Sequence, residues 1–428
     1  MSSPSIKLRR PERDPQFEIA ANAAYYGGRF ELSHLGLLVG LLNGPIFEYD
    51  LRSAYPAAML DLPCPLHTRW EHKPHGRQLP AGELYLAKVS FSHSDGLWCG
   101  LPFRENGGLF WPFQGTGWYW SIEIEADQRF LRANVVVHDL WIARRECDCR
   151  LFDWVSELYE ERRRIGSDTR GYPLKLGLNS LYGKMAQRCG RGPYHDAVSA
   201  GLITALTRAR LLEPLGQDPE AVVMLATDAV FSRRPLALKV GRDLGQWECH
   251  ECPDLFIAQP GVYWSPSDLS ELIKSRGAPR SVIGEAAPRF VEVWNEWHTL
   301  LRQPGAKELI LAERQIPSVP VTVRVFNGCR IALHRGKPWL AGKWEDVQRY
   351  ESFEWRTKRD PTRINVCDEG HIVTFPRPLR IFAESEGYTP ADFDRLIEIS
   401  GENGAPVEID ENMLLEAMPD HIPFLPHK

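Results

Sequence analysis

The spacing of hydrophobic and polar positions changes along the chain, and each spacing predicts a kind of element. Residues 83–145 alternate apolar and polar side chains in stretches such as ELYLAKVSF and NVVVHDLWIA, which predicts antiparallel strands joined by loops. Residues 151–165 and the following segment PLKLGLNSLYGKMAQ instead repeat apolar side chains at helical intervals. We therefore expect a helical hairpin after the strands, then a third helix at 200–212. Short strands and a helix around 286–302 are expected beyond residue 240.

Two acidic residues interrupt this pattern at the ends of predicted strands. Asp50 closes the run IFEY just before a short helix whose first turn accommodates Pro56. Asp228 lies at the tip of a hairpin predicted over 221–232. Because a carboxylate in an apolar strand environment needs a partner, both acids are candidate site residues.

The second helix of the predicted hairpin carries a polar stripe beside its apolar one. Lys175, Asn179 and Tyr182 stand at positions i, i+4 and i+7, so they share one face. Such a face can present groups to a ligand, although a polar stripe alone more often faces water.

Composition and cysteine usage narrow the class of protein. The chain has 428 residues, enough for two or three domains or subdomains, and its 43% hydrophobic and 25% charged residues are typical of a soluble globular protein. No apolar run reaches membrane-spanning length, and the N-terminus lacks the apolar stretch of a signal peptide, so a cytoplasmic location is expected. The nine cysteines are interpreted as reduced thiols.

Two cysteine pairs are weak candidates for zinc. Cys249 and Cys252 form the segment ECHEC, and Cys147 and Cys149 form ECDC. Four thiolates can hold zinc, but neither spacing is followed by a second pair nearby, and the two pairs lie about a hundred residues apart. Zinc is therefore not expected from these motifs.

The charge of the chain is unevenly distributed. The net charge is −5, but residues 381–428 contain eleven acidic and two basic residues, so the first 380 residues are net positive. Arginine clusters at 162–164, 188–191, 208–210 and 356–359 suit contact with phosphates. The acidic segment is either a solubilising flank or a docking segment.

Asp50 and Asp228 come from different strands, and such a pair of carboxylates suits two Mg²⁺ (or Mn²⁺) ions, with the Leu51 carbonyl as a further hard ligand. Two such ions can activate an attacking 3′-hydroxyl and stabilise a departing pyrophosphate. Lys175 and Arg163 would neutralise the triphosphate of a nucleotide.

Three segments, in this order, resemble motifs A, B and C of the family B DNA polymerases, and most of all those of the phage, plasmid and organellar branch: DLRSAYP, KLGLNSLYG and ATDAVFS. The upstream YYGGR is similar to the YxGG element of that branch, and LGQWE, QPGVYW and KRD stand where its palm end and thumb have similar segments. The resemblance covers about residues 25–360 and suggests a bacterial, phage or plasmid context.

The resemblance implies an α+β right-hand polymerase fold with an antiparallel palm sheet, fingers made of a short helical hairpin, and a C-terminal thumb. The expected divisions are an arm with the YxGG-like element (1–40), palm (41–150), fingers (151–190), palm (191–255), thumb (256–380) and the acidic segment (381–428). The implied partners are a DNA primer–template and dNTPs, with a separate exonuclease or accessory subunit as a further possibility.

Family roles carry over to the matching positions. Asp50 and Asp228 are implied as metal ligands, and Tyr55 as the ring that would collide with a 2′-hydroxyl of the incoming sugar. Lys175, Asn179 and Arg163 (with Arg162 or Arg164 as alternatives) are implied to bind the triphosphate, and Tyr182 to pack near the base pair. The residues implied to contact DNA are Tyr25, Gly27, Gly28, Arg29, Gly183, Lys184, Tyr263, Lys358 and Arg359. Taken singly, the tyrosines would be core aromatics, the glycines a turn and the lysine–arginine pair surface charge; the joint order of the motifs favours the functional reading.

The sequence departs from the family pattern in three places. Motif C has Ala226 and Ala229 where DTDS is usual, so the rate of the enzyme is in question. Only 49 residues precede Asp50, too few for a 3′–5′ exonuclease domain, so the chain is expected not to proofread by itself. The 44 residues between Gly183 and Asp228 leave little room for the hairpin by which protein-primed relatives encircle DNA, which predicts weak strand displacement and modest processivity.

Three functions are compatible with these features. The leading one is a template-directed DNA polymerase core. The second, supported by Ala226, is a catalytically weak palm that serves as a DNA-binding or scaffolding subunit. The third is a primase-like enzyme that initiates de novo, against which Tyr55 argues.

Overall fold

A computed structural model gives the arrangement of the chain. It describes residues 13–376 apart from 75–77, 95, 106–107, 167–170, 187–194, 260, 270–271, 276–282, 285–286, 289–290, 293–294, 296–313, 316–318, 352–353, 356–362 and 369–370. The acidic segment 381–428 and most of the helix expected around 286–302 lie outside the described residues.

An antiparallel five-stranded sheet carries both candidate acids. Its strands run in the order β1 (Arg29–Leu32), β10 (Val222–Thr227), β11 (Ala229–Ser232), β3 (Ile46–Leu51) and β12 (Trp247–Cys252). β10 and β11 form the hairpin predicted over 221–232, with Thr227 and Asp228 at its tip. One face of the sheet packs through Tyr49, Leu51 and Val230 against Leu211, Leu212 and Leu215, at the end of α6 (Ala197–Arg210) and in α7 (Leu212–Gln217). Side chains alternate across a strand, so Glu48 and Asp50 lie on the opposite face.

A second, six-stranded antiparallel sheet packs against that opposite face. Its order is β15 (Ile273–Ser275), β14 (Val262–Trp264), β13 (Leu255–Gln259), β2 (His34–Leu38), β21 (His371–Pro376) and β20 (Arg363–Asp368). Ile46, Met224 and Phe231 of the first sheet share one apolar cluster with Phe256 and Trp264 of the second. The division expected at residue 256 therefore falls inside a sheet, and strands assigned to the thumb flank a strand assigned to the N-terminal arm.

A third sheet confirms the antiparallel strands predicted within 83–145. It contains β4 (Thr68–His72), β9 (Asn134–Arg145), β5 (Tyr85–Ser92) and β8 (Gln114–Trp120) in that order. The two-stranded ribbon β6 (Phe103–Glu105) and β7 (Gly108–Phe110), and the helices α1 (Pro15–Ala23) and α3 (Ser121–Phe130), accompany it. Short η1 (Leu41–Asn43) leads from β2 to β3.

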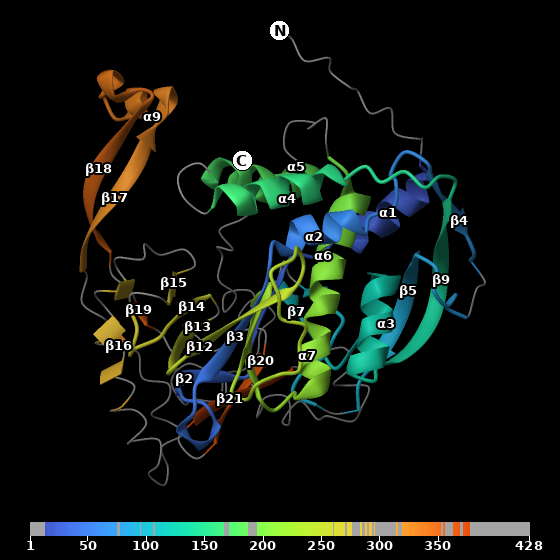
Figure 1. Ribbon diagram of the computed structural model, residues 1–428, viewed down its shortest axis with the longest axis horizontal. Helices are drawn as coiled ribbons and strands as arrows, with labels where there is room; N and C mark the ends of the chain where they lie inside the picture. The colour runs from blue at the N-terminus through green and yellow to red at the C-terminus, as the bar shows by residue number, and fades with distance from the viewer. Residues whose placement is uncertain are drawn as a thin grey trace, which may run out of the picture.

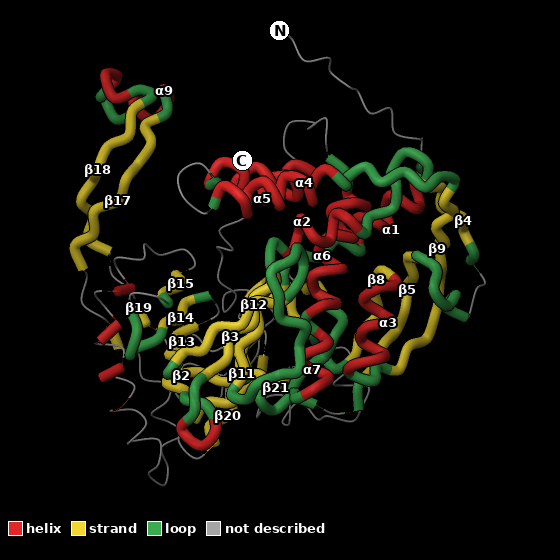
Figure 2. Tube along the Cα trace, in the orientation of Figure 1, coloured by secondary structure: helices red, strands yellow, loops and turns green. Residues whose placement is uncertain are grey.

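Helices α2 (Ala54–Leu60), α4 (Trp154–Ile165) and α5 (Tyr172–Ala186) form a layer above the five-stranded sheet (Figures 1 and 2). The predicted hairpin α4–α5 is present, and its apolar stripes meet α2 and α6 through Met59, Val155, Tyr159, Leu178 and Ile203. The helix predicted at 200–212 is α6.

A long hairpin, β17 (Val319–Asn327) and β18 (Lys343–Glu351), projects from the rest of the molecule (Figure 1). Its tip carries α9 (Cys329–His334) and η3 (Pro338–Leu340), and β16 (Arg314–Gln315) pairs with β19 (Glu354–Trp355) near its base. Among the described helices, none combines the length and apolar character needed to cross a bilayer.

Candidate active site

Asp50 and Asp228 meet at one end of the five-stranded sheet. Asp50 stands opposite Ala229 in the β3–β11 pairing, and the Leu51 N–H donates to the Asp228 carbonyl oxygen at 2.9 Å. The Asp228 N–H closes the turn on the Ala226 carbonyl oxygen at 2.8 Å, which places Thr227 at φ 63°. This region is costly for a β-branched residue, so the tight turn holds Asp228 in a strained but fixed position.

Two further carboxylates join them. Glu48 lies two positions before Asp50 on the same strand face, and Glu248 stands opposite Asp50 on β12. We call Glu48, Asp50, Asp228 and Glu248 the acidic cluster. Sequence reasoning missed both glutamates, although the strand period alone places Glu48 on the face of Asp50.

The pKa values of Glu48, Asp50 and Asp228 in the acidic cluster are raised. Burial, and then the neighbouring charge of Asp50, raise the pKa of Asp228 to about 7. Burial and the nearby carboxylates also raise the pKa of Glu48 and of Asp50. Carboxylates that repel one another in a half-buried site bind a divalent cation well, because the cation replaces the protons. The donor set therefore fits hard ions such as Mg²⁺ or Mn²⁺, with Asp50 and Asp228 as the central oxygen ligands.

Positive groups oppose the acidic cluster from two directions. Lys274 on β15 is the cation with the greatest influence on Glu48 and Asp50, and Lys175 on α5 acts on Asp50 from the helical layer. Lys274 lies outside every motif, so no sequence pattern indicated it. Its cross-strand partner is Tyr263. Tyr263 is buried against Phe231, and burial beside the acids raises its pKa, so its expected contact with the primer backbone stays a prediction.

Three tyrosines connect the YxGG-like element, motif A and motif B. The rings of Tyr55 on α2 and Tyr182 on α5 lie 4.5 Å apart between centroids. The hydroxyls of Tyr182 and Tyr25 lie 2.8 Å apart. All three side chains are partly exposed. The sequence predicted a separate role for each tyrosine. The structure places the side chain of Tyr182 in contact with those of the other two, next to the end of β3 that carries Asp50.

The helical hairpin presents a different arginine from the one expected. Arg162 donates to the Ser53 hydroxyl of motif A at 3.2 Å. Arg163 instead pairs with Glu160 at 2.6 Å and approaches Asp243 at 3.6 Å. Helical rotation of 100° per residue explains why adjacent arginines face different partners. Arg162 is therefore the one that reaches motif A, an alternative that the sequence left open.

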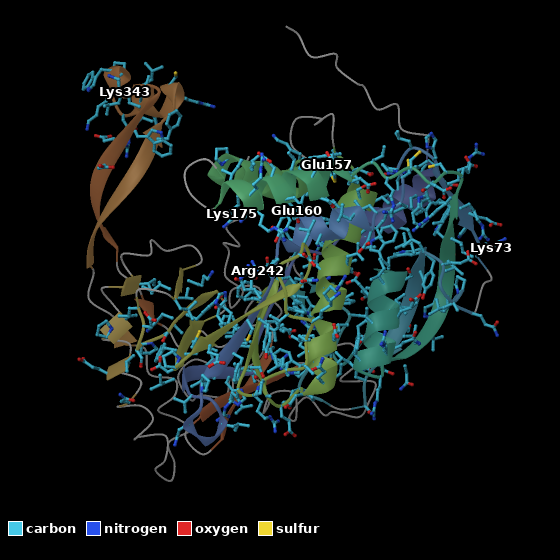
Figure 3. The ribbon with its side chains drawn as sticks, viewed as in Figure 1. Lys73, Glu157, Glu160, Lys175, Arg242 and Lys343 are labelled. Carbon is cyan, nitrogen blue, oxygen red and sulfur yellow. The ribbon has the colours of Figure 1, made fainter. Side chains whose placement is uncertain are left out.

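The polar stripe of α5 lies partly on the side of the hairpin toward the sheets. Lys175 is exposed and points from α5 toward the sheet layer (Figure 3). Gly183 and Lys184 are exposed near the end of the same helix. The side chain of Asn179 and both Lys358 and Arg359 lie outside the described residues, so their roles stay predictions.

The YxGG-like element is held by its backbone. Buried Arg208 donates to the carbonyl oxygens of Tyr26 and Gly27 at 2.8 and 2.6 Å, and pairs with Glu123. A Cβ at Gly28 would lie 2.8 Å from Thr227 Cγ2 and 3.3 Å from the Tyr55 hydroxyl. Glycine is therefore required at 28 by close approach to the motif C turn. Gly27 has no neighbour of this kind and borders open space.

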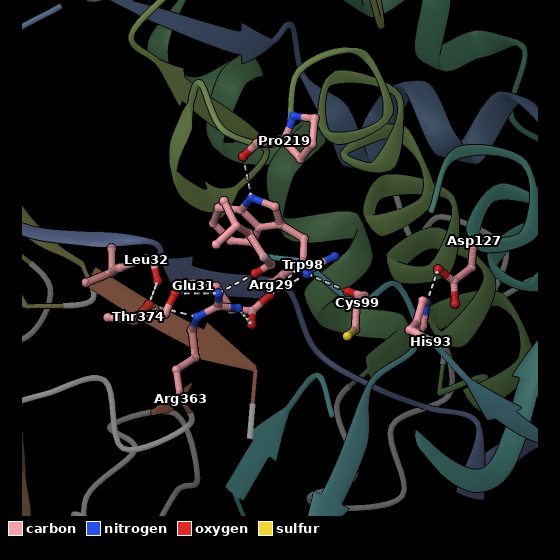
Figure 4. A network of polar contacts seen from close by, with 11 residues as sticks. Arg29, Glu31, Leu32, His93, Trp98, Cys99, Asp127, Pro219, Arg363 and Thr374 are labelled. Atoms are coloured by element: carbon pink, nitrogen blue, oxygen red, sulfur yellow. Dashed lines mark hydrogen bonds and ion pairs between the residues drawn. The ribbon is translucent and has the colours of Figure 1, made fainter. Parts of the chain in front are cut away.

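Arg29 of this element has a structural role, which corrects its expected role in DNA binding. It is fully buried, and its guanidinium donates to Glu31 at 2.6 Å and to the Cys99 carbonyl oxygen at 2.6 Å (Figure 4). Arg363 on β20 contacts the other oxygen of Glu31 at 2.7 Å. Arg29 therefore has no surface to offer a phosphate, because it is fully buried and its guanidinium contacts the Glu31 carboxylate and the Cys99 carbonyl oxygen.

The departures in motif C lie in packed positions. Ala226 and Ala229 face each other across the β10–β11 pair and belong to the apolar cluster between the two sheets. An apolar side chain at 226 suits that cluster, and it leaves Asp228 as the acid of this hairpin.

Comparisons with known proteins agree with the motif order. A family model for type B DNA polymerases, organellar and viral, matches residues 16–192. Among solved structures, the chain is similar to an orthorhombic crystal form of Phi29 DNA polymerase at 15% identity and a TM-score of 0.55, over 82% of this chain and 65% of that one. Phi29 DNA polymerase complexed with primer-template DNA and incoming nucleotides gives a TM-score of 0.52 at the same identity and coverage. A comparison with curated protein sequences gives no match.

At this identity the solved structures show a shared mixed α/β fold with antiparallel sheets, and the chain spans less than two thirds of the length of Phi29 DNA polymerase. The family model covers the YxGG-like element, motif A and motif B, the segments that build the tyrosine group beside Asp50. Residues 16–192 are therefore similar to the organellar and viral family of type B DNA polymerases.

Proposed function

We propose that this chain is a template-directed DNA polymerase core that joins deoxynucleotides to the 3′-hydroxyl of a primer. The observation that carries the proposal is the meeting of Asp50 and Asp228 within a cluster of carboxylates at the end of the sheet. The five-stranded sheet is the palm, the α4–α5 hairpin the fingers, and the β17–β18 hairpin the main part of the thumb.

Asp50 and Asp228 hold two Mg²⁺ (or Mn²⁺) ions, with the Leu51 carbonyl as a further ligand. When bound, such ions supply the charge that activates a hydroxyl nucleophile and stabilises a leaving pyrophosphate. Little covalent chemistry is left to the protein, so positioning and charge compensation determine the rate.

The remaining residues bind and orient the nucleotide. Lys175 and Arg162 neutralise the triphosphate from the fingers, with Asn179 on the same face of α5. The Tyr55 ring lies under the sugar and excludes a 2′-hydroxyl, and Tyr182 packs near the new base pair. Tyr25, Gly27 and Gly28 contact the template strand, Gly183, Lys184 and Tyr263 the nucleic acid near the primer end, and Lys358 and Arg359 the duplex.

Two further properties belong to the same proposal. We expect no 3′–5′ exonuclease activity from the described residues, because those around motif A form strands and helices of the sheets that carry the acidic cluster. The chain also displaces strands weakly, because residues 197–227 between motifs B and C are used by α6, α7 and β10. Long displacement synthesis, or shortening of an unpaired 3′ end by the purified chain, would contradict these two points.

The second candidate is a scaffolding palm that binds DNA with little catalysis, and Ala226 in place of an acid favours it. A primase-like activity is the third; Tyr55 beside Tyr182 opposes it, because the ring would obstruct a ribose.

A primer extension assay separates the three. A labelled primer–template is incubated with dNTPs or NTPs and Mg²⁺ or Mn²⁺, using wild type, Asp50→Asn, Asp228→Asn and the exposed control Asp61→Asn. Extension by wild type and Asp61→Asn, lost in the two other variants, supports the polymerase. DNA binding without extension supports the scaffold, and products from unprimed template support the primase.

A further inference from the structure

Four side chains with soft or borderline ligand atoms converge away from the acidic cluster. They are Cys64, His67, Cys147 and Cys149, and all their ligand atoms lie within 4.8 Å of one another. Cys64 is buried, Cys147 is intermediate, and His67 and Cys149 are exposed. The proposed polymerase chemistry uses none of them.

Strand pairing brings these residues together from distant parts of the sequence. Thr68, the first residue of β4, stands opposite Arg145, the last residue of β9. The Glu146 N–H extends this ladder by donating to the His67 carbonyl oxygen at 3.0 Å. His67 and Cys147 therefore leave the same end of the β4–β9 pair, with Cys64 and Cys149 a few residues further along each loop.

The distances around His67 match a tetrahedral metal centre. Its Nδ1 lies 3.5 Å from the Cys64 sulfur, 3.2 Å from the Cys147 sulfur and 3.6 Å from the Cys149 sulfur. Zinc bonds of about 2.3 Å to sulfur and about 2.0–2.1 Å to nitrogen, set at tetrahedral angles, separate the nitrogen from each sulfur by about 3.6 Å. One nitrogen placed almost equally far from three sulfurs is the arrangement that such an ion requires.

We propose that Cys64, His67, Cys147 and Cys149 bind one Zn²⁺ ion in a closed Cys₃His site. Four protein ligands leave no position for a substrate or a reactive water, so the ion has a structural role. Three thiolates and a neutral imidazole suit zinc better than Mg²⁺, which prefers oxygen ligands. The two metal environments of the chain are therefore chemically separate, and the zinc site does not depend on the proposed polymerase function.

The position of the ion indicates what it stabilises. Cys64 follows α2, the helix with Tyr55, by a short loop, and Cys149 precedes α4, the helix with Arg162. The ion joins these two loops at the base of the α4–α5 hairpin. It fixes where the chain leaves the third sheet and enters the helical layer.

The cysteine pair that stood out first in the sequence as a weak zinc candidate is not part of the site. Cys249 and Cys252 lie on β12, and among the described residues they are not grouped with Cys147 and Cys149. The other two ligands have the spacing Cys64-x-x-His67, a motif that was not recognised in the sequence.

Metal analysis of the full chain, expressed with zinc and purified without chelator, tests the proposal. We expect one zinc per chain in wild type, in Asp228→Asn and in Cys329→Ser, which removes an exposed cysteine elsewhere. We expect less than a tenth of that in the double variant Cys147→Ser/Cys149→Ser. Unchanged zinc in the double variant, or loss of zinc in Asp228→Asn, would overturn the assignment.

Two measurements on the wild-type chain keep the test valid if the double variant does not fold. Replacement of zinc by Co²⁺ should give the strong visible absorption of tetrahedral cobalt with thiolate charge transfer. Removal of the metal by a chelator should expose three more thiols to a thiol-reactive dye. No zinc after purification, weak six-coordinate cobalt absorption, or an unchanged number of reactive thiols would each refute the site.

Discussion

The backbone N–H of Leu51 donates a hydrogen bond to the carbonyl oxygen of Asp228, and this 2.9 Å contact joins the end of β3 to the turn between β10 and β11. It brings together two carboxylates that lie far apart in the sequence. Because the contact is made by main-chain atoms, the side chains can change without separating the two strand ends. Substitutions of Asp50 or Asp228 should therefore report on charge and metal binding more than on the fold.

Asp228→Asn should abolish primer extension and, without metal, stabilise the protein at pH 8. Folding raises the pKa of Asp228 from 3.8 to about 7, so the native state holds a proton that the unfolded state releases. Stability is therefore lost as the pH rises from about 4 to about 7 and stays lower above it. Removing this ionisation raises the free energy of unfolding by roughly 2 to 4 kcal/mol at pH 8, because one pKa unit corresponds to about 1.4 kcal/mol.

Denaturant unfolding at pH 5 and pH 8, with and without Mg²⁺, measures this effect. Mg²⁺ should stabilise wild type and have little effect on the variant. If the variant were less stable than wild type at pH 8 without metal, burial and the charge of Asp50 would not be destabilising ionised Asp228.

The Mg²⁺ requirement should depend on pH near neutrality. Protonated Asp228 cannot act as an anionic ligand, so the Mg²⁺ concentration for half-maximal extension should rise as the pH falls below about 7. The expected change is up to about tenfold for each pH unit. Metal titrations of extension rate at pH 6, 7 and 8 give the answer, with DNA binding measured at each pH as the control. A flat metal requirement over this range would argue against Asp228 as a ligand.

Tyr55→Ala should relax the choice of sugar, whereas Tyr55→Phe should retain it. The ring, which packs 4.5 Å from Tyr182 between centroids, supplies the steric block, and the hydroxyl adds little to it. We expect kcat/KM for a ribonucleotide relative to its deoxynucleotide to rise at least about tenfold in Tyr55→Ala, corresponding to about 1.4 kcal/mol. Single-nucleotide incorporation kinetics measure the ratio. Equal discrimination by the Ala and Phe variants would show that the ring does not select the sugar.

Arg162→Ala should weaken nucleotide binding more than Arg163→Ala. Arg162 reaches Ser53 of motif A, whereas Arg163 is occupied by Glu160 on its own helix. Loss of one cation that contacts the triphosphate should raise the KM for dNTP by about tenfold or more, since a charged hydrogen bond contributes about 1.5–3 kcal/mol. The matched pair is compared by steady-state kinetics on one primer–template. A larger effect at Arg163 would restore the assignment made from the sequence.

Glu31→Gln should destabilise the fold without acting at the site. Glu31 is fully buried between Arg29 and Arg363, so an amide there leaves two buried guanidinium groups with no carboxylate. Loss of one partner of a buried ion pair costs about 3–5 kcal/mol. Denaturant unfolding should show this loss, while the control Glu83→Gln, which removes an exposed pair with Arg144, should change little. Equal effects of the two substitutions would contradict the buried network.

Local patterns predicted the elements that are regular in themselves. The helical hairpin, the helix at 200–212 and the hairpin with Asp228 at its tip depend on the spacing of apolar residues over one segment, and all three are present. Motif order also predicted the family whose model matches residues 16–192. These features need no information about distant contacts.

Features that depend on long-range pairing were not predictable. Sheet membership of β2, β13 and β20 is set by partners far along the chain, so the expected division at residue 256 cuts one sheet. From the sequence alone, Arg29 is expected at the surface. Its burial follows from the ion pair with Glu31 and from the second arginine, Arg363, that contacts the same carboxylate. The position of Lys274 near Asp50 and the grouping of Cys64 with Cys147 are further examples, because only the pairing of distant strands brings such residues together.

The buried ion pairs of Glu31 with Arg29 and Arg363 have a consequence for folding during synthesis. Glu31 on β1 leaves the ribosome well before Arg363, which follows it by 332 positions. Until Arg363 has been synthesised, Glu31 and Arg29 lack their third ion-pair partner. Likewise, β2 lacks its neighbouring strand β21. Final closure of the two sheets is thus a late event, and a chaperone that protects the nascent N-terminal half would have its greatest effect before that moment.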